Sequence, residues 1–356
     1  MTRFIRPGAA TAAAMSSVLI VGLATACATS GPDALSASSP AQEVVVYSGR
    51  SEELVGPLFA QFTEQTGIPL QVRYGESAEL AAQLIEEGDR TPAQVYFSQD
   101  AGALGAVSAA GLLAPLPDEV AQAVPAAYRA TDGTWTGVTG RARVIAYDAD
   151  QVAPEDVPTS VFELVDPKWR GQVAIAPTNA SFQSFVTAMR LTEGEQRTQE
   201  WLAGLVANDV QTYEKNGLIL DAVDAGQVAL GLINHYYWFE KAKEVDPRAM
   251  RARLAFTASG DPGSLVNVAG VGLTTAAGRS PAAGRSPAAE GFISWLLSPD
   301  VQQWFADSTS EYPLLPGVPA PEGTKPLAEL RGPDVTLAQL ADLPATLEML
   351  ARVGLL

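Results

Sequence analysis

Two adjacent tyrosines carry the clearest metal chemistry in this sequence. Tyr236 and Tyr237 follow Asn234 and His235, and His235 is the only histidine of the chain. A bound cation lowers the pKa of its ligands, so neighbouring phenols, which titrate near about 10 when free, can become phenolates on one metal ion. A hard cation prefers such anionic oxygen to sulfur. The alternative is that both rings are half-buried aromatics where a strand meets a helix.

Strand and helix patterns alternate along the first part of the chain that should fold. Apolar, β-branched runs predict strands over 44–48, 68–74 and 91–97, and periodic apolar residues predict helices from Ser51 to Gly67 and from Ser77 to Gly88. This alternation is typical of a parallel α/β sheet, in which ligands gather at the carboxyl ends of strands. Four polar residues follow such ends and are possible contacts from this part: Ser51, Glu52, Gln99 and Asp100.

The middle of the chain repeats the α/β pattern. Strands are predicted over 172–176, 210–213 and 228–233, and helices over 182–191 and 195–207. The last of these strands leads directly to the tyrosine pair. Two longer extended runs, 135–147 and 264–273, could pass from one lobe to another.

Composition restricts the class of function. The chain has 356 residues, enough for two lobes, and a formal net charge of -17, which argues against nucleic-acid binding because phosphate contacts need a basic surface. Its single cysteine, Cys27, excludes an intramolecular disulfide and a cysteine metal cluster. With one histidine and no serine nucleophile elbow, an enzyme is not expected.

The amino terminus reads as a secretory signal. Arg3 and Arg6 precede a short apolar stretch that ends in small residues before Cys27. This order predicts a lipoprotein signal peptide over 1–26, lipidation of Cys27 and a flexible tether over 27–42. Ala24 stands where a lipobox usually has leucine, so an ordinary signal peptide cut near Ala26 is the alternative.

From Glu43 onward, the chain resembles the periplasmic ferric-ion-binding proteins of bacterial iron-uptake ABC transporters. The matching segments, in order, are 46–50 (Val-Tyr-Ser-Gly-Arg), 91–95, 110–115, 140–144, 167–171, 234–238 (Asn-His-Tyr-Tyr-Trp) and 311–313 (Glu-Tyr-Pro). The Asn-X-Tyr-Tyr-Trp element is the most specific of them, and the others mark the fold.

The resemblance implies a set of site residues. Tyr236, Tyr237 and Tyr147 would be the metal ligands, so that about three phenols would ionise on binding. Positions that hold an anion fall on Thr139, Gly140, Arg141, Asn216 and Asn234. In the first lobe the sequence departs from the family: Ser51 replaces a histidine, Glu52 a tyrosine and Gln99 a glutamate. Glu52 or Asp100 could substitute for them.

The resemblance also implies a fold and a transport role. The fold would be α/β, a two-lobe periplasmic-binding-protein fold of type II with lobes joined by crossover strands. Residues 43–142 and 268–317 would form lobe 1, and 143–267 and 318–356 lobe 2. The protein would be a monomer, lipid-anchored to the outer face of the cytoplasmic membrane, that captures Fe³⁺ with carbonate or phosphate and delivers it to an ABC permease and ATPase.

Two other functions are compatible with the same residues. The scaffold could bind a polyamine, a sugar, an organic anion or an iron chelate, because the first-lobe ligands of the family are missing. The second is a structural or adhesion lipoprotein, although such a protein would not need polar residues at the ends of its strands. The side chain of His235, between Asn234 and Tyr236, is expected to point away from the metal and to be structural.

Overall fold

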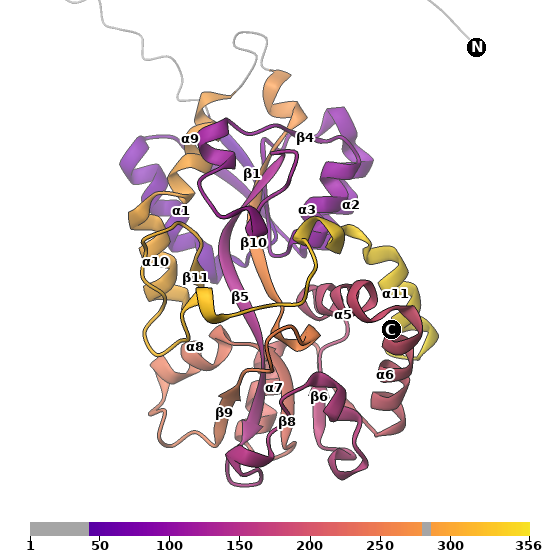
Figure 1. Cartoon of the computed structure of the whole chain (residues 1–356). Helices are drawn as coiled ribbons and strands as arrows, with labels where there is room; N and C mark the ends of the chain where they lie inside the picture. Colours follow the sequence, from indigo (N-terminus) through magenta and orange to yellow (C-terminus); the bar gives the residue numbers. More distant parts are fainter. Residues whose placement is uncertain (1–42, 280–285) are drawn as a thin grey trace, which may run out of the picture. The chain divides into compact units, whose positions relative to one another are not determined.

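The computed structural model describes residues 43–279 and 286–356 (Figure 1). The predicted signal peptide, Cys27 and the tether lie outside the described residues. Within the described part, eleven strands form one hydrogen-bonded network in which β2, β1, β3, β10, β5, β8, β6 and β7 are successive neighbours, and β4, β9 and β11 pair beside them.

The strands are β1 (Val44–Ser48), β2 (Leu70–Tyr74), β3 (Val95–Ser98), β4 (Leu113–Ala114), β5 (Trp135–Asp148), β6 (Val173–Ile175), β7 (Gln211–Thr212), β8 (Leu230–Asn234), β9 (Ala252–Ala255), β10 (Val266–Thr274) and β11 (Tyr312–Pro313). The α-helices are α1 (Glu52–Thr66), α2 (Ser77–Glu87), α3 (Ala101–Ala109), α4 (Asp118–Ala121), α5 (Ala180–Glu193), α6 (Glu195–Ala207), α7 (Asn216–Asp224), α8 (Tyr236–Glu244), α9 (Pro287–Leu296), α10 (Pro299–Thr309) and α11 (Leu343–Arg352).

Strand β5 joins the two halves of the sheet. Its first part pairs with β10 up to Ala142, and its second part pairs with β8 from Arg143 onward. All fourteen of its residues are buried, including the charged side chains of Arg141, Arg143 and Asp148. Figure 1 shows β5 running from the β1 half to the β8 half of the molecule.

In the first half, β1 pairs in parallel with both β2 and β3, as the strand and helix alternation predicts. Two strands begin later than expected, at Leu70 rather than 68 and at Val95 rather than 91. Each predicted start includes a proline, which has no N–H for the ladder, and the amide of Ala93 donates instead to the hydroxyl of Thr91.

The second half places two apolar layers on opposite faces of its strands. Ile145 and Tyr147 of β5 belong to the largest buried cluster, which also includes Phe182 and Phe185 of α5. Val144 and Ala146 belong to another cluster, on which Tyr237 packs. Successive strand residues point to opposite faces, so these two sets cannot meet through the sheet.

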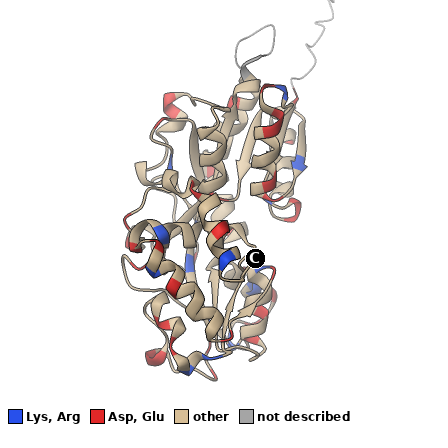
Figure 2. Ribbon diagram, turned by 90° about the vertical axis from the view of Figure 1, so that its right-hand side faces the viewer, with Lys and Arg blue, Asp and Glu red and all other residues tan. Residues whose placement is uncertain are grey.

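The carboxyl-terminal segment packs on elements from both halves. The short turn η9 (Leu337–Ala341) packs on α3, and α11 packs on α5. A Cβ on Gly105 of α3 would lie 2.7 Å from Ala341, so the bare glycine allows η9 to approach. Among the described helices, none combines the length and apolarity that a membrane span requires. Acidic residues are spread over helices and loops of both halves (Figure 2).

Candidate metal and anion site

The tyrosine pair stands at the junction of β8 and α8. β8 ends at Asn234, one residue beyond the predicted strand, and α8 begins at Tyr236. The two rings stack with centroids 4.3 Å apart and an interplanar angle of 27°. Tyr236 is 6% exposed, and Tyr237 is partly exposed. Neither phenol oxygen hydrogen-bonds to another described residue, so both are free to ligate an incoming ion.

Two buried guanidinium groups lie on the Tyr236 side of the pair. Arg50, after β1, donates to Glu311 at 2.8 Å, and Arg141 of β5 has its Nε 3.8 Å from the same carboxylate. All three of these side chains are at most 2% exposed. Arg50 Nη1 and all three guanidinium nitrogens of Arg141 lack a hydrogen-bond partner in the described part of the chain. One carboxylate therefore balances two buried cations.

The ionisation of this cluster follows from its burial. Burial and the neighbouring phenol of Tyr237 raise the pKa of Tyr236 well above its ordinary value, and the cations of Arg50 and Arg141 oppose that rise. Burial and the charge of Arg50 lower the pKa of Arg141. Without a metal, Tyr236 is thus a neutral phenol. Arg50 and Arg141 beside it carry one more positive charge than Glu311 balances, so an anionic group would complete the cluster.

A group of hydrogen-bond donors surrounds the amino terminus of α5. Asn179 caps this helix by accepting from the amide of Ser181 at 3.1 Å and from its hydroxyl at 2.6 Å. Three donors converge on the Ser181 oxygen: Arg143 at 3.0 Å, Asn234 at 3.2 Å and Asn216 at 3.4 Å. Side-chain donors gathered at a helix amino terminus, where the helix dipole favours negative charge, make this place a candidate anion site.

The fold brings this donor group next to Tyr237. Asn216 begins α7, and a Cβ on the following residue, Gly217, would lie 3.9 Å from the Tyr237 ring. The helix can approach β8 because Gly231 has no side chain; a Cβ there would lie 2.3 Å from Ile219. The oxygen Oδ1 of Asn216 is buried and unpaired. We call Asn179, Ser181, Asn216, Asn234 and Arg143 the Ser181 cluster.

His235 has a structural role, as expected. Its Nδ1 accepts from the amide of Ala142 at 3.2 Å, so Nε2 carries the proton and donates to the carbonyl of Ser310 at 2.9 Å. The ring stacks on Tyr312 at 4.7 Å and is fully buried. Burial lowers the pKa of His235 to about 4, which keeps the ring neutral. Ser310, whose carbonyl accepts this hydrogen bond, adopts a left-handed φ of 53°.

The structure does not bring Tyr147 to the pair. Tyr147 pairs with Leu230 on β8, four residues before Asn234, where β8 ends. Its side chain belongs to the apolar layer of Ile145, whereas Tyr237 packs on the opposite layer. At roughly 3.3 Å per residue, Tyr147 is about 13 Å along the strand from the site. At this position the phenol ring of Tyr147 is part of the apolar core.

The other expected anion positions divide into two places. Asn216 and Asn234 contribute to the Ser181 cluster, and Arg141 lies by Tyr236. The hydroxyl of Thr139 is already used, since it donates to Glu311 at 2.9 Å. Gly140 lies in the middle of the sheet, because it pairs with β10 on one side and with β11 on the other. An anion therefore cannot reach its amide from a sheet edge.

The four possible first-lobe contacts differ in how free they are. Ser51 precedes α1 without a side-chain cap bond, and Glu52 occupies the first turn; both are exposed. The backbone amide of Gln99 donates to the hydroxyl of Ser77 at 2.8 Å. Asp100 is 3% exposed and caps α3 through Ala103, and its second oxygen is unpaired. Among the described residues, no three histidine, cysteine or acidic side chains are grouped to hold a metal.

Sequence reasoning missed three parts of this site. Arg50 and Glu311 stand inside the segments that carry the family resemblance, but their ion pair joins residues 261 positions apart. Ser181 had a local signal, an Asn-Ala-Ser start typical of a helix cap, which could have pointed to an anion site. Pairing across such distances follows from the fold and not from spacing.

A mixed α/β sheet, parallel within each half and antiparallel where β5 and β10 cross, with polar groups at strand ends defines a ligand-binding protein of the two-lobe type II class. Comparisons agree: residues 91–330 match the family described as bacterial extracellular solute-binding protein. The major ferric iron-binding protein of Neisseria meningitidis serogroup B is 32% identical over 328 residues, 90% of this chain and 96% of that protein.

Solved structures with a similar fold include two with bound iron. Iron-bound HitA from Pseudomonas aeruginosa has a TM-score of 0.81 at 32% identity, covering 88% of this chain and 99% of that one. A Trichodesmium protein in complex with iron and citrate has a TM-score of 0.75 at 26% identity, covering 88% and 100%. The chain belongs to the periplasmic ferric-ion-binding family of bacterial solute-binding proteins. The predicted fold class is confirmed, and the family is one of transport proteins rather than enzymes, as expected.

Proposed function

We propose that this protein captures ferric iron through the phenolates of Tyr236 and Tyr237 and delivers it to an ABC permease with its ATPase. The observation that carries this proposal is the stacked, unpaired phenol pair beside two buried guanidinium groups that share a single carboxylate and keep unpaired nitrogens. The ferric-binding function of the relatives supports the choice of ion. Iron is here the cargo and not a resident cofactor.

Charge balance calls for an anion beside the iron. Two phenolates cancel two of the three charges of Fe³⁺, and the adjoining Arg143 is a further cation. Burial and the charge of Arg141 lower the pKa of Arg143 to about 9, so it stays charged at neutral pH. The Ser181 cluster supplies the donors for carbonate or phosphate bound with the metal. The citrate named with the Trichodesmium protein is a precedent for such an anion.

Replacing Asn216 by alanine is expected to weaken ferric binding by about 10–100-fold, the usual cost of losing a group that supports metal ligands. The loss should be largest when bicarbonate or phosphate is supplied, because Asn216 would act on the anion. Titration of the iron-free protein with a ferric chelate, with and without each anion, measures both quantities. Asn208→Ala is the matched control, since that buried amide donates to Asp166 instead. Equal effects of the two substitutions would contradict the anion role of Asn216.

We further propose that residues 43–142 with 268–317, and 143–267 with 318–356, act as two lobes that close on the ion. Lobe 2 would supply the tyrosines and the Ser181 cluster, and lobe 1 would supply Arg50 and the exposed Ser51 and Glu52 as a lid. Metal bound to one lobe shifts the population toward the closed state, because only that state adds contacts from the other. Calorimetry with ferric ion and with a polyamine or sugar decides between this cargo and another solute.

Cys27 is proposed as the lipid attachment site that holds the mature protein, as a monomer, on the outer face of the cytoplasmic membrane. Support comes from the sequence alone, since the position lies outside the described residues. Cys27→Ser should move the protein from the detergent phase to the aqueous phase in a Triton X-114 partition of expressing cells. An unaltered protein found in the aqueous phase would favour an ordinary signal peptide.

A further inference from the structure

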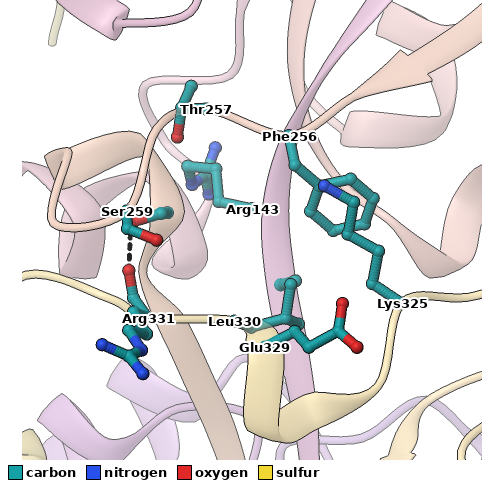
Figure 3. Close-up of a pocket in the computed structure, with 10 residues that line it drawn as sticks. Arg143, Phe256, Thr257, Ser259, Lys325, Glu329, Leu330 and Arg331 are labelled. Atoms are coloured by element: carbon teal, nitrogen blue, oxygen red, sulfur yellow. Dashed lines mark hydrogen bonds between the residues drawn. The ribbon is translucent and has the colours of Figure 1, made fainter.

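A pocket of ≈ 70 Å³ lies beside the residues where β5 passes from one half of the sheet to the other. Its walls are β5 at Ala142 and Arg143, the connection from β9 to β10, and the carboxyl-terminal segment around η8 (Leu327–Glu329) (Figure 3). One water needs roughly 10–15 Å³ of such space, so the pocket accommodates a group of about five heavy atoms. We call it the crossover pocket. The tyrosine pair does not line it.

The floor of the crossover pocket has two buried donors without partners. Arg143 is 2% exposed and Thr257 is 8% exposed. Arg143 Nη1 and the hydroxyl of Thr257 make no hydrogen bond within the described part of the chain. Figure 3 shows both side chains at the same end of the pocket. Buried polar groups are nearly always satisfied, so a ligand that accepts from both would complete this floor.

The rim of the crossover pocket adds exposed cations. Lys325 lies over the Phe256 ring, with its ammonium 4.8 Å from the centroid, and Arg331 is also a lining residue. Across residues 43–279 and 286–356, no carboxylate pairs with the Lys325 ammonium or the Arg331 guanidinium. Glu329 is the one acid among the lining residues, which also include Arg143, Lys325 and Arg331. A local surplus of positive charge stands out in a chain of net charge -17.

We propose that the crossover pocket binds a small oxyanion, of the size of phosphate, bicarbonate or acetate. The unpaired Nη1 of Arg143 and the hydroxyl of Thr257 on the floor match two oxygens of such an ion, and the Lys325 ammonium would meet a third from the rim. The site is separate from the Ser181 cluster, although Arg143 touches both: its Nη2 donates to Ser181 while its Nη1 is unpaired. This proposal does not depend on iron binding.

Amide NMR of the iron-free mature protein tests the proposal. Sodium phosphate, sodium acetate and sodium chloride are titrated at constant ionic strength, and the amides of Thr257, Ser259 and Arg331 report on the crossover pocket. We expect saturable shifts there with an oxyanion and none of comparable size with chloride. Phosphate held by the Ser181 cluster would shift a different set, the amides after Asn179. The relative affinities of phosphate and acetate identify the class of oxyanion.

A double variant, Thr257→Val with Lys325→Gln, removes one floor donor and one rim cation while keeping their approximate volume. It should weaken oxyanion binding at the crossover pocket about tenfold, which corresponds to about 1.4 kcal/mol, and leave shifts at the Ser181 cluster unchanged. Arg248→Gln is the control, because Arg248 is an exposed cation outside the pocket lining. Absent shifts, equal shifts with chloride, or an unchanged affinity in the double variant would each overturn the proposal.

Discussion

Replacing Tyr236 by phenylalanine is expected to reduce the visible phenolate-to-iron absorption at saturating iron and to weaken ferric binding by more than about a hundredfold. Residues that only support metal ligands already account for about 10–100-fold, so a lost ligand should cost more. The substitution removes one oxygen from a ring that is 6% exposed, stacks on Tyr237 and has no hydrogen bond within the described residues, so the fold should persist. Absorption spectra and a competition titration with a ferric chelate measure both effects. Tyr237→Phe should change the absorption and the ferric affinity in the same direction.

Tyr147→Phe is the matched control, and it also decides the ligand count. Tyr147 is a similarly buried phenol in the same half of the sheet, but its side chain lies on the opposite face from Tyr237. We expect colour and affinity to survive this change. Bleaching by Tyr147→Phe would establish three phenolates and require a rearrangement of β5. A Tyr236→Phe protein with unchanged absorption and unchanged ferric affinity would refute the paired phenolates.

The same pair sets the number of protons released. Burial raises the pKa of Tyr236 well above its usual value, so this phenol is protonated at neutral pH until the ion displaces the proton. With two phenolates, about two protons should leave for each Fe³⁺ bound, and ferric affinity should rise as pH rises through the neutral range. Calorimetry in buffers of different ionisation enthalpy counts these protons; the three-tyrosine ligand set would give about three.

Local patterns predicted the frame of this protein better than its site. The order of strands and helices, and the strand-to-helix junction at Tyr236, depend on periodicity and on nearby turns, which the sequence displays directly. The position of Tyr147 did not follow, because a ligand role carried over from relatives ignores how far along β5 the residue lies from the end of β8. Arg143, which strand alternation places on the same face as Tyr147, lies at that end and belongs to the Ser181 cluster.

The buried charges were harder to predict for a different reason. Arg50, Arg141 and Glu311 come from three elements far apart in the sequence, and their meeting depends on β11 pairing beside β5. The resemblance pointed to Arg141 but offered no partner for it. The sequence shows charged residues in apolar surroundings, which signals burial, but only the fold shows that two cations share one carboxylate.

Glu311→Gln is expected to lower the free energy of unfolding by roughly 3–5 kcal/mol, the usual cost of removing one partner of a buried ion pair. Glu311 is fully buried, 2.8 Å from Arg50, and it accepts from Thr139 at 2.9 Å. Glutamine keeps the shape and can keep one hydrogen bond, so the loss comes from leaving two guanidinium groups uncompensated. Urea denaturation of the iron-free protein measures the change.

Two comparisons separate this effect from ordinary damage to the fold. Asp209→Asn breaks the pair with Arg170, in which both side chains are 65% exposed, and should cost at most about 1 kcal/mol. Asparagine also tolerates the left-handed φ of 55° at this position. Adding Arg50→Met to Glu311→Gln removes one of the stranded cations, so the double variant should be more stable than Glu311→Gln alone. A double variant that is less stable would mean that packing, and not uncompensated charge, accounts for the loss.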